Sequence, residues 1–171
     1  MHTITAIALL VFPVLMIASA LSDLTTMTIP NRITGALILT FFPAAIMAGL
    51  SPGAILACVG VGAACLVGGA VMFALRWIGG GDAKVIAGAG LWLGVSGIGP
   101  FLMWTAVAGG LFGLSLLFAR SWAQPYVGYG PRWVGRLLEP KGDIPYGVAI
   151  AVGALAAFPQ CALMLGNTGV F

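Results

Sequence analysis

Long apolar runs separated by short polar breaks occupy most of this chain, and they limit the folds open to it. Hydrophobic residues make up 61% of the 171 residues and charged residues only 6%. Because a soluble domain carries about a quarter charged residues, the composition predicts an integral membrane protein. None of the runs alternates with the period of two expected of a barrel strand, so we expect helices. The length is enough for one compact membrane domain over residues 1–171.

Six runs are long enough, or nearly so, for a transmembrane helix, which needs about 20 residues. We therefore predict an all-α, polytopic membrane protein with six transmembrane helices. Glycines at short spacings in the third to fifth runs are expected to let helix backbones pack closely. The predicted spans are Ile4–Leu21, Ile33–Leu50, Ala54–Leu75, Ala83–Ile98, Phe101–Ala119 and Ile144–Leu165. The packing glycines are Gly60, Gly62, Gly68, Gly69, Gly90, Gly94, Gly109, Gly110 and Gly113.

All seven Lys and Arg residues fall on one side of these spans. The positive-inside rule makes that side cytoplasmic and places both termini outside, which is the periplasm in a bacterium. The four acidic residues lie on the same side, so we expect the chemistry to face the cytoplasm. The net charge of +3 then reflects topology and contact with lipid headgroups, with no indication of nucleic acid binding.

A short amphipathic pattern lies in the long connection between the fifth and sixth spans, residues 120–143. We expect a short helix in the headgroup layer, serving either as a plain anchor or as a lid and docking surface near the site. Its apolar face holds Trp133, Val134, Leu137 and Leu138, and its polar face holds Arg132, Arg136 and Glu139.

Three of the four acidic residues stand at the ends of predicted spans, and two of them, Asp23 and Asp82, are the candidates for chemistry. Asp23 follows the first span and is followed by a short turn, and Asp82 precedes the fourth within Gly79-Gly80-Gly81-Asp82-Ala83-Lys84. Ionisable groups at such positions are costly and point to function. Taken singly, Asp82 could cap a helix beginning at Ala83 and Asp23 could be a solvated boundary residue. Taken together, they fit a catalytic pair, with the glycines leaving room beside Asp82.

Two neighbouring carboxylates do not both ionise easily, so they share a proton. The ionised one can take a proton from water while the protonated one hydrogen-bonds to a scissile carbonyl. Which aspartate plays which role is left open, since such a pair titrates as a unit. The sequence has no zinc-ligand spacing and no phosphate-binding loop, so neither a metal nor another cofactor is expected. A non-enzymatic membrane scaffold and a proton-coupled small transporter remain the alternatives.

Three further segments have plain structural interpretations. Asn31, after Pro30, is expected to be the N-cap of the second span. Asp143 is expected to cap the last span, with Pro145 in its first turn and Tyr146 at the membrane interface. Lys84 is two positions from Asp82, a spacing that does not imply an ion pair, and is expected to reach the headgroups.

The ordered set of motifs resembles the type IV prepilin peptidases, a family of membrane aspartic proteases with a GxGD motif. Gly79-Gly80-Gly81-Asp82 matches GxGD, and Lys84 falls where the family often has a lysine. Asp23 with Ile29-Pro30-Asn31 looks like its first-aspartate segment, and Ile144-Pro145-Tyr146-Gly147 like the start of its last helix. The resemblance implies catalysis by Asp23 and Asp82. It also implies that the site is shaped, or substrate bound, by Gly79, Gly80, Gly81, Lys84, Pro30, Asn31, Pro145, Tyr146 and Gly147.

The implied activity is cleavage of the leader peptide of prepilins and pseudopilins at the cytoplasmic face of the bacterial inner membrane. Larger relatives carry an N-terminal cytoplasmic insertion with paired CxxC motifs and an N-methyltransferase activity. This sequence lacks that insertion, so methylation is not expected. In size the chain is similar to the short peptidases of tight-adherence (Flp) pilus systems. Its expected partners are the prepilins, membrane lipids and the pilus assembly machinery.

Overall fold

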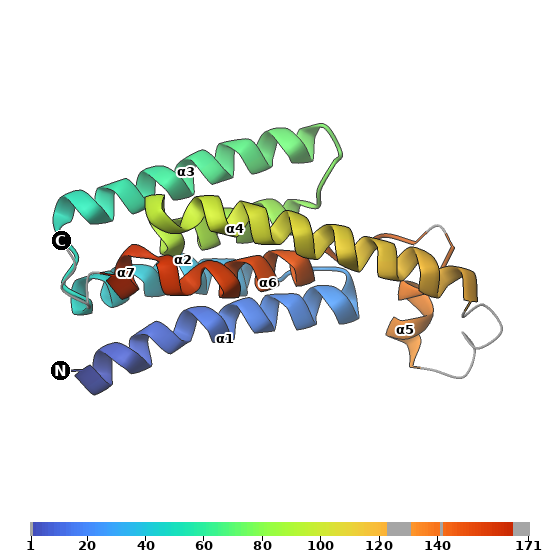
Figure 1. Cartoon of the computed structure of the whole chain (residues 1–171), viewed down its shortest axis with the longest axis horizontal. Helices are drawn as coiled ribbons and strands as arrows, with labels where there is room; N and C mark the ends of the chain where they lie inside the picture. Colours follow the sequence, from blue (N-terminus) through green and yellow to red (C-terminus); the bar gives the residue numbers. More distant parts are fainter. Residues whose placement is uncertain (1, 123–130, 141, 166–171) are drawn as a thin grey trace.

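The protein is an elongated bundle of helices, seen in a computed structural model that describes residues 2–122, 131–140 and 142–165 (Figure 1). No strand occurs in these ranges, so the all-α prediction is confirmed. The helices are α1 (His2–Thr26), α2 (Asn31–Met47), α3 (Pro52–Ala74), α4 (Gly80–Trp122), α5 (Arg132–Leu137), α6 (Tyr146–Ala157) and α7 (Ala162–Leu165), with a 3-10 turn, η2 (Phe158–Gln160).

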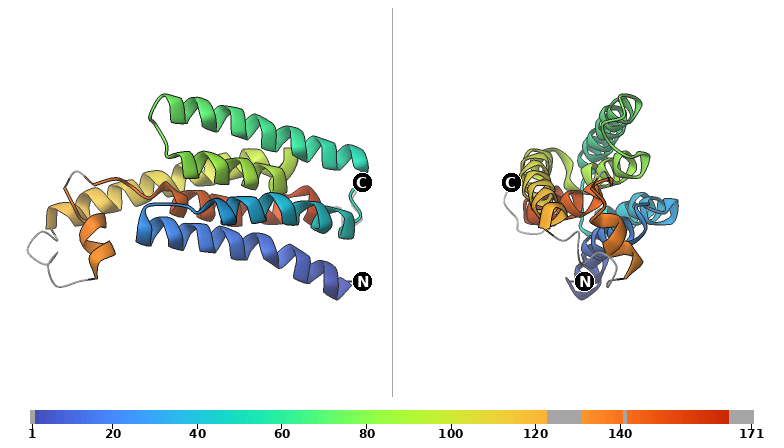
Figure 2. Two further views of the ribbon diagram at one scale, coloured as in Figure 1. Left: turned by 180° about the vertical axis from the view of Figure 1, so that it is seen from behind. Right: turned by 90° about the vertical axis from the view of Figure 1, so that its right-hand side faces the viewer.

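The long helix α4 is two antiparallel legs joined at Gly94. This glycine has φ 61° and ψ −164°, a region that is essentially restricted to glycine, and the ribbon reverses near it in both side views (Figures 1 and 2). A straight helix of this length would measure about 64 Å, roughly twice the hydrocarbon thickness of a bilayer. The sequence predicted the reversal between Ile98 and Phe101. The structure begins it earlier, and Gly94 serves the turn rather than helix packing.

The two legs of α4 pack against different helices. The first leg, residues 80–93, lies along α3, where Gly69 faces Ala83. The second leg, residues 95–122, lies along α6, where Gly109 faces Ala149. A Cβ at Gly90 would lie 2.7 Å from Cys65 Sγ and would force the Cys65 side chain to shift, so this glycine favours the close approach of α3 and α4.

The packing role predicted for the glycines is thus confirmed where they face a neighbouring helix, as at Gly62, Gly69, Gly90 and Gly109. The same prediction is wrong at other positions, where a Cβ would meet nothing within 4 Å: Gly60, Gly68 and Gly110.

An aromatic cluster fills the interior of the bundle. Trp92 is fully buried, its ring centroid 5.2 Å from Phe12 and 5.9 Å from Phe41. Its indole Nε1 donates to the Leu37 carbonyl at 2.7 Å. Phe158 also stacks on Phe12, with ring centroids 4.9 Å apart. Each such ring pair adds about 0.5–1.5 kcal/mol beyond the burial of its area, so this cluster fixes α1, α2, α4 and η2 relative to one another.

Three helical segments are long and apolar enough to cross a membrane by length and composition: Leu9–Thr26, Pro52–Ala74 and Gly80–Trp122. The other two apolar helical segments, Asn31–Met47 and Tyr146–Gln160, are shorter. Large apolar side chains cover the outside, as with Leu39 and Phe118, which are 72% and 69% exposed. Such a surface suits lipid better than water. Six crossings and periplasmic termini stay predictions.

Two predicted spans differ from the helices observed. The first helix continues to Thr26, so Asp23 lies in its last turns rather than in a loop after it. The last predicted span is not continuous, because the helix ends at Ala157 and Cys161 is extended, with ψ 154°. Pro159, which has no backbone N–H to donate, lies in this interruption.

Candidate active site

Asp23 and Asp82 meet at one end of the bundle, where α1 and α3 end and α4 begins. We call it the site end, and call the opposite end, where α2 ends and α4 reverses, the far end (Figure 1). Both aspartates are only 7% exposed. They line one cavity of about 610 Å³, which is bounded by the end of α1, the α3–α4 connection, the start of α4 and residues 143–146. The pairing of these two acids is therefore supported by their position in the fold.

Asp23 is held by the first turn of α6. Its Oδ2 accepts a hydrogen bond from the Gly147 N–H at 2.8 Å. The N-cap of α6 is Pro145, which makes no side-chain cap hydrogen bond, so Asp23 supplies from α1 the acceptor that the helix start lacks. A Cβ at position 147 would lie 2.8 Å from both the Cβ and the Oδ2 of Asp23. Only glycine leaves this carboxylate in place.

Asp82 lies in the first turn of α4. Its Oδ2 accepts from the Gly79 N–H at 3.2 Å, and the Ala83 N–H donates to the Gly79 carbonyl at 3.1 Å. Gly79 therefore occupies the cap position, and Asp82 reaches back to it as the acidic residue of a capping box does. The idea that Asp82 itself is the cap of a helix starting at Ala83 is wrong, because the helix begins at Gly80.

The two carboxylates also interact electrostatically, since the negative charge of Asp23 acts on Asp82. Their hydrogen bonds come from backbone N–H groups, one to each. Two acids placed in this way favour a state in which a single proton is shared between them. Such a pair can offer one proton donor and one proton acceptor to a group bound in the cavity.

Lys84 and Asn31 form a bridge beside the site. The Lys84 Nζ donates to the Asn31 Oδ1 at 2.9 Å, joining the starts of α4 and α2. The predicted N-cap role of Asn31 is wrong, because Pro30 occupies that position in extended conformation and Asn31 is the first helical residue. The bridge connects the starts of the two helices, and neither residue is in the cavity lining.

Arg120 binds the backbone of Asp143, which lines the cavity. It is buried, 8% exposed, near the end of α4. Its Nε donates to the Leu137 carbonyl at 2.9 Å and one terminal nitrogen donates to the Asp143 carbonyl at 2.8 Å. Asp143 does not cap α6, contrary to the sequence prediction, since Pro145 is the N-cap. Sequence reasoning counted Arg120 only as a topology signal, and no local pattern indicates its burial.

The amphipathic helix predicted in the long connection is α5. Its apolar residues are half-buried and its arginines are exposed, as expected. Arg136 donates to the Thr25 carbonyl at 3.1 Å, so α5 lies against the end of α1. Its place in the headgroup layer stays a prediction. Part of the predicted connection lies outside the described residues.

The remaining predicted site residues divide into two groups. Those that line the cavity are Gly79, Gly80, Gly81, Pro145 and Tyr146. Those outside the lining are Pro30, Asn31, Lys84 and Gly147, of which Gly147 contacts Asp23 directly. Sequence reasoning missed six lining residues at or just past the ends of α1 and α3, which carry no motif: Met27, Thr28, Phe73, Arg76, Trp77 and Ile78. In the part of the chain that the structure describes, no cluster of three or more His, Cys, Asp or Glu is placed to hold a metal ion.

The fold and the site together define a helical protein of membrane type, in which two buried aspartates line one cavity. Residues 10–114 match the model of the type IV leader peptidase family. Because this match covers more than half of the chain, the protein belongs to that family, as its resemblance to the prepilin peptidases implied. The matched segment includes Asp23, Asp82 and the residues between them. No curated protein and no solved structure gives a significant match.

Proposed function

We propose that the chain is an aspartic endopeptidase that removes the leader peptide of type IV prepilins and pseudopilins, those of Flp-like pili among them. Family membership implies leader peptidase activity. The observation that carries the aspartic mechanism is the convergence of Asp23 and Asp82, far apart in the sequence, on one cavity. No cofactor enters the proposed reaction.

In this mechanism the substrate enters the cavity as an extended peptide with its scissile carbonyl between the two carboxyl groups. The ionised carboxylate takes a proton from a water molecule, whose oxygen attacks the carbonyl carbon. The protonated carboxyl group hydrogen-bonds to the carbonyl oxygen and stabilises the negative charge that develops there. Breakdown of the tetrahedral intermediate transfers a proton to the leaving amine, and the shared proton is restored to the pair.

The site is proposed to face the cytoplasm. The basic residues of the described chain gather at the site end, on the starts of α2 and α4, the ends of α3 and α4, and α5. By the positive-inside rule this end lies on the cytoplasmic side of the bacterial inner membrane. A prepilin has a basic leader in the cytoplasm and an apolar helix in the bilayer. Its scissile bond would then lie at the depth of Asp23 and Asp82.

The test is cleavage of a purified prepilin by the purified protein in detergent, followed as loss of the leader. Asp23→Asn and Asp82→Asn are each expected to lower the rate by at least about 100-fold, the smaller end of what general acid–base groups contribute. Glu139→Gln makes the same chemical change at an exposed carboxylate outside the cavity and should keep the wild-type rate. EDTA is expected to leave the rate unchanged.

Two results would contradict the proposal. A wild-type protein that does not cleave would favour the scaffold or the proton-coupled transporter. Retention of most of the rate by either folded aspartate variant would remove the carboxylate pair from the mechanism.

A further inference from the structure

Three of the described helices are followed, just past their last turn, by a residue in the left-handed conformation. After α2 this residue is Gly49, with φ 77°; after α1 it is Met27, with φ 55°, and after α3 it is Arg76, with φ 60°. Glycine is the usual residue at such a position, because it has no Cβ to clash with the backbone. The chain follows this rule at the far end and breaks it twice at the site end.

Met27 and Arg76 share a second property. In the described chain they are the only non-glycine residues with positive φ, and both line the cavity that holds Asp23 and Asp82. Neither is Asn, Asp or His, the types that tolerate this conformation best. Gly49, in contrast, is exposed and a Cβ there would meet nothing within 4 Å. Where the turn alone matters the chain has glycine, and where the turn borders the cavity it keeps a long side chain at a cost in stability.

The geometry points to Met27 and Arg76 as substrate-contacting residues, kept in strained backbone because their side chains bind the peptide. This inference rests on the proposed function and extends it to the binding of the substrate. Strained residues that cluster at a site are a recognised sign of function.

The chemistry of the two side chains indicates what each would bind. Among the residues that the structure describes, Arg76 is the one Lys or Arg in the lining, and the acids there are Asp23, Asp82 and Asp143. A guanidinium there can donate to the acceptor oxygens of an extended peptide and hold it beside the acids. Met27 lines the same cavity as the apolar residues Ile29 and Ile144, and its flexible thioether can adapt to apolar side chains of different shapes.

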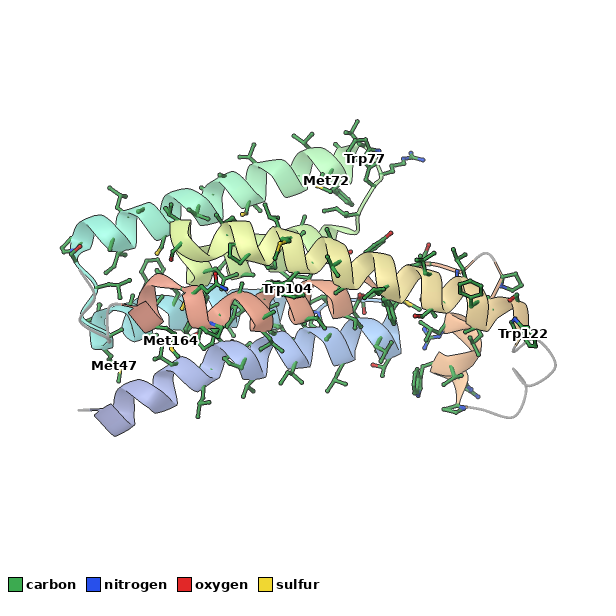
Figure 3. The ribbon with its side chains drawn as sticks, in the orientation of Figure 1. Met47, Met72, Trp77, Trp104, Trp122 and Met164 are labelled. Carbon is green, nitrogen blue, oxygen red and sulfur yellow. The ribbon has the colours of Figure 1, made fainter. Side chains whose placement is uncertain are left out.

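The position of Arg76 also suits an entering peptide. Its neighbour Trp77 is 67% exposed and lies at the α3–α4 connection, at the edge of the bundle (Figure 3). Both residues line the cavity, and Arg76 is exposed while Met27 is half-buried, so Arg76 is the more accessible of the two to a peptide arriving from outside.

The experiment replaces each residue by glycine, which releases the strain, and by alanine, which keeps it. Thermal unfolding in detergent, kcat and KM for a purified prepilin, and binding of its fluorescently labelled leader peptide are measured. Met27→Gly and Arg76→Gly are expected to raise the unfolding temperature by about 2 °C. They should also raise KM about five- to tenfold with little change in kcat, as for binding that is equal in the ground and transition states. Met27→Ala and Arg76→Ala should raise KM equally with no gain in unfolding temperature.

The matched control is Gly49→Ala at the far end, which should lower the unfolding temperature and leave KM and kcat unchanged. Arg76→Lys, which keeps the charge and the strain, should recover part of the affinity. Wild-type KM and wild-type peptide binding in the glycine and alanine variants would overturn the inference. So would a KM effect of Arg76→Gly that occurs only in vesicles containing anionic lipid, because Arg76 would then be a headgroup anchor.

Failure of the inference is distinguishable from failure of the proposed function. If the wild-type protein binds the leader peptide but does not cleave it, the peptidase proposal fails. Weaker peptide binding in the Met27 and Arg76 variants would still support the assignment of these residues.

Discussion

The two ends of this bundle solve the same problem, how to end a helix, in different ways. At the far end the positive φ angles belong to Gly49 and Gly94, and no Asp, Glu, Lys or Arg of the described chain lies there. At the site end they belong to Met27 and Arg76, beside two buried carboxylates. The far end follows the rules for a stable fold. The site end departs from them around the cavity, which is where function is expected to oppose stability.

The largest effect that separates the two ends is expected at Gly147. Gly147→Ala would place a Cβ 2.8 Å from the Asp23 Oδ2 and displace the carboxylate. A misplacement of about 1 Å can cost about 100-fold in rate, so cleavage should fall by that factor or more. The loss is measured as kcat on a purified prepilin, with circular dichroism to confirm folding.

Gly110→Ala is the matched control for this change. Gly110 is also helical, but a Cβ there would meet nothing within 4 Å. We expect wild-type cleavage and a stability gain of about 0.5–1 kcal/mol, the usual preference for alanine over glycine within a helix. Equal rates for the two variants would show that the contact between Gly147 and Asp23 has no role in cleavage.

An effect of intermediate size is expected at Trp92 in the interior, where the change should lower stability and leave substrate binding unaltered. Trp92→Phe removes the donor to the Leu37 carbonyl and part of a fully buried ring. Leaving a buried acceptor with one partner fewer costs about 1–3 kcal/mol, so the unfolding temperature in detergent should fall. Cleavage by the folded fraction should keep its KM, because Trp92 lies outside the cavity lining. A change in KM without a loss of stability would contradict this prediction, because it would show that Trp92 affects substrate binding.

The smallest effect is expected for the bridge between Lys84 and Asn31. Both residues are exposed, and a hydrogen bond of this kind contributes about 0.5–1.5 kcal/mol. Lys84→Met and Asn31→Ala should each slow cleavage only about threefold, since the bridge aligns α4 and α2 without touching the substrate. In a double-mutant cycle the combined variant should be no slower than either single one. Fully additive losses would mean that the two residues act separately.

The sequence allowed much of the site to be predicted, because the relevant signals are local. An acid at the end of an apolar run is unusual enough to single out Asp23 and Asp82, and the basic residues predict that both aspartates lie on the same side of the membrane. The spacing of apolar and polar residues in α5 likewise predicts a helix. These signals need no knowledge of which helices touch.

What could not be predicted depends on contacts between segments distant in the chain. Asn31 was expected to cap its own helix, but Lys84 from α4 binds it and Pro30 holds the cap position. The burial of Arg120 follows from the two carbonyls that it reaches, and neither is near it in the sequence. The left-handed backbone of Met27 has no sequence signal at all, since the residue type argues against it.

The central claim is that Asp23 and Asp82 act as one catalytic unit. It is tested most directly by comparing cleavage rates of a purified prepilin for Asp23→Asn, Asp82→Asn and the double variant. Groups that work as a unit are strongly non-additive, so the account predicts that the double variant cleaves no more slowly than either single variant. A loss in the double variant equal to the product of the two single losses would show that the aspartates act independently and would contradict the account.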